Sequence, residues 1–192
     1  MNPITHLLVS WVIADSADLD KRERNAVTLS GVIPDIDSFG IIAEQLTKES
    51  GHPLFWWSDY HHILGHNIGF GILVAVVVFI VSKKKWKTMG LALFCFHLHL
   101  LCDIVGAKGP DGYQWPIPYL LPFSNAIQIV WKYQWEINAW PNFVITVAAL
   151  AVTFYYAWKN GYSVLGMISK KMDLVFVRTL QNRFGDSSKT ID

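Results

Sequence analysis

The chain has 192 residues, of which 52% are hydrophobic and 14% aromatic, while only 16% carry a charged side chain. Soluble domains contain roughly a quarter charged residues, so this composition argues against a disordered chain, a fibre or a highly charged nucleic-acid binder. The formal net charge is +1, which gives no global field for a polyanion, and we expect no nucleic-acid partner. The two cysteines, Cys95 and Cys102, cannot build a disulfide framework.

The first sixty residues predict two short helices followed by a connection. Asn2 and Pro3 are a good cap and first turn for the first helix, and the charged segment 18–24 interrupts the pattern. A second helix is predicted from about 25 to 32, before Pro34. The connection over 35–60 contains a predicted short helix near 41–46 and ends in an aromatic stretch.

The strongest structural signal lies in the middle of the chain. Every residue of 68–81 is apolar or glycine, and a helix that began near His62 would have about 20 residues and a length of about 30 Å, enough to cross a bilayer. A lysine-rich segment follows at 83–87, and residues 89–107 then contain a single charged residue, Asp103. After a connection rich in proline and tryptophan, Pro141 begins a last apolar segment.

These segments predict an all-α fold, a multi-helix integral membrane bundle with a His/Asp metal centre at one end. The runs are apolar on all faces, and tyrosine and tryptophan cluster at their ends as in interfacial belts. We expect residues 1–160 to form the membrane-embedded domain, with three to five membrane-associated helices, and 161–192 to form a basic cytoplasmic tail. The first two helices are short for a complete crossing.

One candidate site is the pair His99 and Asp103, which share a helix face at i,i+4 spacing. A carboxylate in an otherwise uncharged span is costly without a partner. The pair can be a His–Asp ion pair, both side chains can bind one metal, or Asp103 can orient a metal-bound histidine. His97 lies about 200° around the helix from His99, so we expect a structural role for it.

A second cluster contains His61, His62 and His66. His62 and His66 have the i,i+4 spacing with which two imidazoles on a helix meet one metal, whereas His61 converges with His66 only if it precedes the helix. The alternative is a polar cap at the membrane interface.

The third cluster is the segment Pro34-Asp35-Ile36-Asp37. In an extended chain Asp35 and Asp37 would project to the same side and could bind or bridge cations, while the alternative is that Asp37 or Ser38 only caps the next helix. His6, in the first turn of the first helix, is a weak signal by itself.

The order of these motifs resembles a known family. The chain resembles bacterial inner-membrane proteins described as membrane-bound metal-dependent hydrolases, which are distantly similar to zinc-dependent phospholipase C. The motifs that carry the resemblance are, in chain order, Thr5-His6, PDID, a histidine pair separated by four residues, H-x-x-x-D and a later Pro122-Phe123. The resemblance covers about residues 4–125. The chain departs from the family pattern at His62, where arginine is usual, and at Asn67, where serine is usual; an arginine would pair with phosphate. The family register favours His61 as a ligand and helix spacing favours His62, so both are kept.

Threading the predicted helices back and forth collects His6 and all three clusters at one end of the bundle. Three basic residues fall on that side and 13 on the opposite side. Because short-loop Lys and Arg mark the cytoplasmic face, we expect a multi-pass protein of the inner (plasma) membrane with its active site on the extracytoplasmic side and its C-terminus in the cytoplasm.

The sequence therefore predicts a membrane-embedded metal-dependent hydrolase that acts on a phosphoester or other ester of a lipid. We expect two zinc-like ions, with Asp37 and His66 as catalytic residues and an aromatic entrance formed by 55–60 and 115–123. The expected partners are the bilayer and a lipid-like substrate. The rival functions are a metal or proton-coupled transporter and a non-catalytic membrane protein with a structural metal site. The candidate metal ligands are His6, Asp35, Asp37, His61, His62, His66, His99 and Asp103.

Overall fold

The computed structural model describes residues 1–109 and 112–185, and within these ranges the fold is mostly helical, without a β-strand. The prediction of an all-α membrane fold is thereby confirmed. The helices are α1 (Pro3–Ser16), α2 (Lys21–Ser30), η1 (Ile33–Phe39), α3 (Gly40–Thr47), α4 (Trp56–Tyr60), α5 (Ile68–Val81), α6 (Lys85–Gly106), α7 (Trp140–Asn160), η2 (Val164–Met167) and α8 (Lys170–Phe184).

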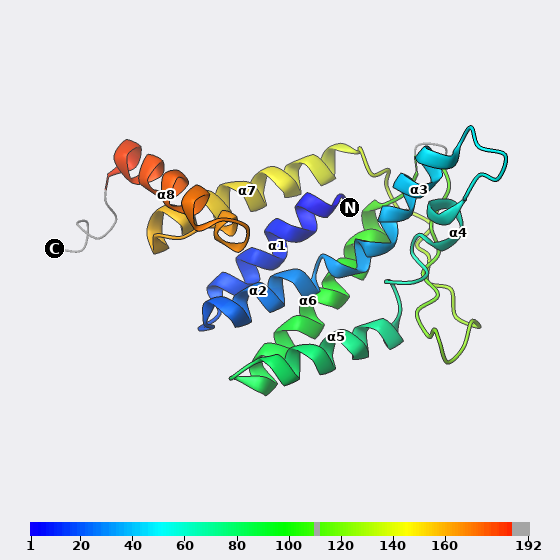
Figure 1. The fold of residues 1–192 in the computed structure, drawn as a ribbon, viewed down its shortest axis with the longest axis horizontal. Coiled ribbons are helices and arrows are strands. Elements are labelled where there is room, and N and C mark those ends of the chain that lie inside the picture. The colour runs from blue at the N-terminus through cyan, green and yellow to red at the C-terminus, as the bar shows by residue number, and fades with distance from the viewer. Residues whose placement is uncertain (110–111, 186–192) are drawn as a thin grey trace.

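The long helices run along the longest axis of the molecule (Figure 1). α1 packs against both α2 and α7, α6 packs against α2 and α5, and α5 and α6 form an antiparallel hairpin. α3 and α4 lie at one end of the molecule, and α8 lies at the other. The chain therefore returns to the α3–α4 end after each hairpin, which brings distant segments of the sequence together there.

The start of α2 differs from the prediction because of a side-chain cap. α2 begins at Lys21, not near residue 25, and it ends at Ser30. The Asp20 side chain accepts a hydrogen bond from the backbone N–H of Glu23 at 2.9 Å, and the Glu23 carboxylate accepts one from the N–H of Asp20 at 3.3 Å. This capping box starts a helix within the charged segment that apolar periodicity marks as an interruption.

The start of α5 also differs, and the difference changes the geometry of the histidines. The prediction that this helix begins near His62 is wrong, because Asn67 caps it by accepting a hydrogen bond from the N–H of Phe70 at 2.9 Å. α5 has 14 residues and is therefore about 21 Å long. His62 has a positive φ of 64°, so the histidine segment is a turn rather than a helix face.

The PDID segment is helical rather than extended. It lies in η1, a 3₁₀-helix with Pro34 in its first turn. Residues two apart in a 3₁₀-helix are separated by about 240° around the axis, so Asp35 and Asp37 point to different sides of the helix. The predicted alignment of the two carboxylates is therefore wrong.

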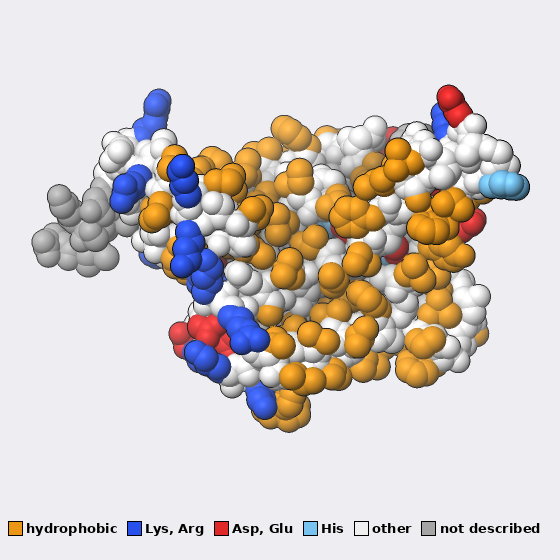
Figure 2. Space-filling model, in the orientation of Figure 1, with side chains coloured by type: hydrophobic (Ala, Val, Ile, Leu, Met, Phe, Trp, Pro, Cys, Tyr) orange, Lys and Arg blue, Asp and Glu red, His pale blue; other side chains and the backbone are white. Residues whose placement is uncertain are grey.

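Two helices, α6 and α7, are long and apolar enough to cross a membrane, and there are three crossings if α2 and the η1–α3 segment, bent by 55°, count as one. Lys and Arg side chains gather at the end that holds the starts of α2 and α6 and the helix α8, while apolar side chains cover much of the remaining face (Figure 2). Residues 110–111 and 186–192, part of the predicted loop and tail, lie outside the described residues. The division at residue 160 stays a prediction.

Candidate metal centre

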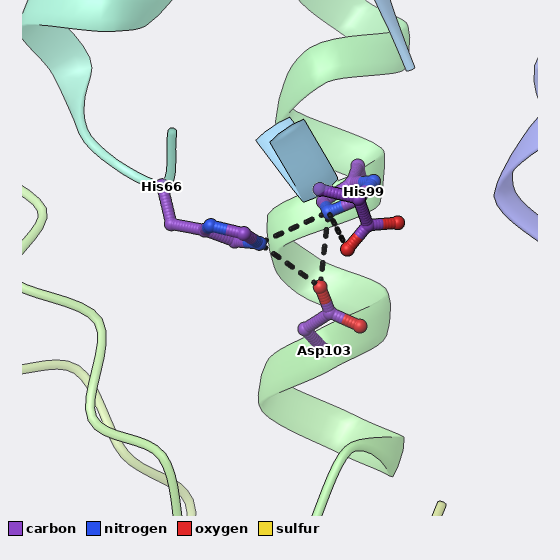
Figure 3. Close-up of side chains that lie close together, drawn as sticks. His66, His99 and Asp103 are labelled. Carbon is purple, nitrogen blue, oxygen red and sulfur yellow. Dashed lines mark hydrogen bonds and ion pairs between the residues drawn. The ribbon is translucent and has the colours of Figure 1, made fainter. Parts of the chain in front are cut away.

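Four side chains from three separate segments converge at the α3–α4 end of the bundle. They are Asp35 of η1, His66 of the turn before α5, and His99 and Asp103 of α6, and one ligand atom from each lies within 4.8 Å of all the others. Figure 3 shows that His66 approaches across the gap between segments, whereas His99 and Asp103 lie one turn apart on α6. All four belong to the predicted clusters, so a His/Asp group that can hold a metal ion is present.

The spacing of these atoms fits the coordination shell of a zinc-like ion. His66 Nε2 lies 3.1 Å from His99 Nε2 and 3.4 Å from Asp103 Oδ2, and His99 Nε2 lies 3.0 Å from the same oxygen. Ligands bound tetrahedrally at 2.0–2.1 Å from zinc are separated by about 3.3 Å. The atoms thus stand at the separations that a single ion between them requires.

The two histidines of this group are oriented through their other ring nitrogen. His66 Nδ1–H donates to Asp37 Oδ2 at 3.1 Å, and His99 Nδ1–H donates to the carbonyl of Gly31 at 2.9 Å. Both bonds leave Nε2 pointing at the group. A carboxylate or a backbone carbonyl behind the imidazole is the usual support of a metal-binding histidine.

Asp37 supports the group from behind. Its Oδ1 accepts a hydrogen bond from His61 Nδ1 at 3.0 Å, and its Oδ2 accepts bonds from His66 and from the N–H of Gly65 at 3.3 Å. With both oxygens occupied by protein donors, Asp37 holds the histidine turn in place. It lies outside the four-residue group, as does His61.

His6 and His62 lie on the rim of the group. His6 Nε2 is 3.1 Å from Asp103 Oδ1, the oxygen opposite the one that faces His66 and His99, and its ring stacks on His99. His62 Nε2 is 3.9 Å from Asp103 Oδ2. The amino group of Met1 also contacts Asp103 Oδ1. All eight predicted ligands therefore lie in one neighbourhood, but the described residues place four ligand atoms around one position only.

Burial sets the electrostatics of the centre. Burial lowers the pKa of His62 well below its usual value, with His66 nearby adding to the effect. Burial also lowers the pKa of His66, but its contacts with Asp103 and Asp37 outweigh burial and raise that pKa to about 9. A cation that binds His66 competes with this proton. Buried Asp103 Oδ2, the oxygen that faces His66 and His99, has no hydrogen-bond partner, as expected for an atom that faces a cation. Buried Asp35 Oδ2 also has no hydrogen-bond partner.

The two aromatic segments of the predicted entrance contact each other. Trp57 packs against Trp115 with ring centroids 5.1 Å apart, and His61 lies against both rings. A cavity of about 270 Å³ beside His61 is lined by the loop after α6, including Asn125 and Gln128. His97 bonds to the Leu93 carbonyl and to the Tyr119 hydroxyl, in agreement with the structural role expected for it.

Several supporting groups escape sequence reasoning. Gly31 orients His99 through its backbone carbonyl, and Gly65 binds Asp37 through its N–H, and neither contact has a side-chain signal. Gln134 donates to the Asp103 carbonyl at 2.6 Å from a loop distant in sequence. Ser38, considered in the sequence only as a helix cap, has its hydroxyl 3.3 Å from His61 Nδ1.

Comparison with known proteins gives one match. The sequence model of the family described as YdjM inner membrane protein covers residues 1–177. The chain belongs to this family. The predicted inner-membrane location is thereby confirmed, and the match reaches beyond α7 to include most of α8. No curated protein and no solved structure matches the chain significantly. The family description names a location and no reaction, so the likeness to hydrolases and to phospholipase C stays a prediction.

Proposed function

We propose that the chain is a membrane-embedded metal-dependent hydrolase that cleaves an ester of a lipid. His66, His99 and Asp103 would hold a zinc-like ion, which would act as a Lewis acid and lower the pKa of water toward neutrality. The observation that carries the proposal is the convergence of these three buried ligand atoms at separations of 3.0–3.4 Å, with both imidazoles held from behind.

The fourth member of the group, Asp35, supports a catalytic site over a structural one. Asp35 Oδ1 is 3.7 Å from His99 Nε2, farther than the other three atoms are from one another. Asp35 is 9% exposed, whereas His66, His99 and Asp103 are at most 1% exposed. It therefore stands on the accessible side, where a catalytic zinc site keeps its open position. We assign the role of general base to Asp35, whereas the catalytic carboxylate predicted from the sequence is Asp37.

The reaction is then an ordinary hydrolysis. Asp35 accepts a proton from water, the water oxygen forms a bond to the phosphorus or carbonyl carbon of the ester, and the ester oxygen leaves with a proton. A lipid substrate is supported by the position of the centre at one end of apolar helices that are long enough to cross a bilayer. The clustering of the ligand-type residues at this end speaks against a transport path along the bundle.

The second ion of the sequence prediction remains a proposal with less support. Asp103 could bridge two ions, since Oδ2 faces His66 and His99 while Oδ1 faces His6. On the Oδ1 side, however, the described histidines offer only His6 within 3.5 Å. One tightly held ion is therefore the expectation for the purified protein.

Turnover measurements test the hydrolase proposal. Metal-replete protein in detergent micelles is assayed on a panel of phospholipids and lipid phosphates, with metal content and thermal unfolding measured in parallel. We expect Asp35→Asn to lower turnover about 10²-fold, the typical contribution of a general base, while keeping its metal. The matched control is Asp59→Asn, an exposed carboxylate in α4. Absence of turnover across the panel, with metal present, would favour a structural metal site.

The charge distribution supports an extracytoplasmic centre. Lys83, Lys84, Lys85 and Lys87 lie between α5 and the first turn of α6, at the end opposite the centre, and short loops rich in lysine stay in the cytoplasm. We expect an impermeant thiol reagent to label His52→Cys, next to α4, from outside intact cells, and to leave Lys85→Cys unlabelled. The unaltered chain gives the background of Cys95 and Cys102. The reverse pattern would put the centre on the cytoplasmic side.

A further inference from the structure

An apolar groove leads away from Asp35 along the surface of the bundle. Its volume is about 430 Å³, and it lies between α2 and the η1–α3 segment. Leu29, Val32, Ile33, Ile36, Ile41 and Ile42 form its walls. Asp35 is the charged residue of the lining, and its Oδ2 is buried without a hydrogen-bond partner. The groove therefore has an apolar body and a single acidic end, and that end belongs to the metal centre.

A second apolar hollow continues the groove toward the basic end of the molecule. It has a volume of about 330 Å³ between α2 and α5, shares Leu29 and Ile33 with the first, and reaches Ala26 and Val81. Ala26 and Asp35 are nine residues apart in sequence, on opposite sides of the bend. The two hollows together follow α2 away from the centre, toward the opposite side of the membrane.

The groove lies where the chain bends. α2 and the η1–α3 segment are together apolar enough for one span, but they meet at 55°. Large apolar side chains are uncovered on both arms of the bend, including Leu29 at 52% and Ile42 at 53% exposure. Asp35 follows the bend, and the carboxylate that approaches His99 also borders the groove.

We propose that this groove binds one acyl chain of the lipid substrate and places the adjoining ester at Asp35. The inference rests on the proposed function and deepens it, because it fixes the direction from which the substrate enters. An acyl chain suits the groove because its lining is apolar apart from Asp35 and Ser38, whose hydroxyl contacts His61, while a lipid's first polar group follows directly after its chain. The lining belongs to a bent helix pair that is together apolar enough for a membrane span, so we place this face against lipid hydrocarbon and expect the occupant to enter sideways from the bilayer.

Photolabelling tests the groove without depending on catalysis. Metal-free protein in detergent is titrated with phosphatidylglycerol that carries a diazirine in one acyl chain, and labelled peptides are mapped by mass spectrometry. We expect labelling of residues 26–42 to saturate and to be displaced by unlabelled phosphatidylglycerol. Labelling of the lipid-facing side of α7 should instead rise in proportion to the probe.

A filled groove provides the matched comparison. Leu29→Trp should lower the saturable labelling at least fivefold, whereas Val144→Trp on α7, where Val144 is also 52% exposed, should leave it unchanged. Both positions tolerate a larger side chain because they are half-exposed. Labelling of residues 26–42 that rises linearly and is equal in the two variants would overturn the proposal. So would a dimer in light scattering that Leu29→Trp converts to monomer, because the groove would then bind a second copy.

The outcomes separate this inference from the hydrolase proposal. Saturable labelling together with an absence of turnover supports the lipid groove and removes the hydrolase. Turnover together with linear, non-saturable labelling removes the groove and leaves the hydrolase standing.

Discussion

The two ends of the molecule treat their carboxylates in opposite ways. At the basic end, Asp18 and Asp20 are paired with lysines in water: Lys84 Nζ lies 2.6 Å from Asp18 and Lys83 Nζ lies 3.3 Å from Asp20. At the other end, the ion pairs of buried Asp103 are with imidazoles and the Met1 amino group. Exposed pairs of the first kind contribute little to stability, whereas a buried carboxylate is costly unless cationic or hydrogen-bonding groups surround it. The same residue type is thus a solubilising group at one end and a candidate metal ligand at the other.

The sharpest way to break this comparison is to remove a buried imidazole. We expect His99→Ala to abolish metal binding, because it removes the ligand that lies closest to Asp103 Oδ2. The matched control is His97→Ala, which removes an imidazole two residues away that bonds to Leu93 and Tyr119. Metal content per chain after purification without chelators measures both. A His99→Ala protein that retains stoichiometric metal would contradict the assigned centre.

Removing the metal from the unaltered chain should also distinguish the two ends. An ion that binds only the folded chain adds about 2.7 kcal/mol at a free concentration of 100 times its Kd. We therefore expect a chelator to lower the midpoint of thermal unfolding in detergent, and added zinc to restore it. His99→Ala should show no such shift. An equal shift in both proteins would mean that the ion binds elsewhere.

Weakening the support behind His66 should have a smaller effect. Asp37→Asn keeps the shape of the side chain but loses the charge that polarises His61 and His66. Groups behind a metal ligand typically change metal affinity by 10–100-fold. We expect a loss in that range in a competition titration with a calibrated chelator, with the fold retained. Loss of all bound metal would instead make Asp37 a direct ligand, as the sequence predicts.

The smallest effect is expected at the basic end. Lys84 lowers the pKa of exposed Asp18 through a hydrogen bond and through its charge. Because both side chains are solvated, Asp18→Asn should change neither metal content nor turnover, and the unfolding midpoint should stay within experimental error. A loss of metal in this variant would show that the two ends are coupled.

The candidate centre could be located from the sequence because successive helices run in opposite directions, and the positions of the loops show where each helix turns back. Each apolar run returns across the bundle, which predicts that four segments lie at the same end. These segments are His6, the PDID segment, the histidine turn and His99 with Asp103. The structure brings them together as threading predicts. The fold class could be predicted from the apolar runs and the aromatic residues at their ends, and the structural role of His97 from its spacing relative to His99.

Which of the clustered residues contribute ligand atoms and which only support them could not be predicted, because this depends on local backbone geometry. The extended and 3₁₀ forms of PDID direct Asp35 and Asp37 differently, and nothing in four residues decides between them. The start of α5 depended on one capping contact of Asn67. Because this cap starts the helix at Ile68, His62 and His66 both precede it. Their relative position is set by a turn, and the i,i+4 geometry of a helix does not apply to them.

Gly65 gives the centre a fixed dimension. A side-chain carbon at this position would stand 2.1 Å from the carbonyl oxygen of Pro34, a main-chain atom that cannot rotate away. The backbones of the histidine turn and of η1 are therefore in contact at Gly65, with no room for a side chain between them. The gap that the candidate ligands bridge is set here by main-chain contact and not by the packing of neighbouring side chains. Substitutions of the apolar side chains around the centre are consequently expected to leave the separation of the two segments unchanged.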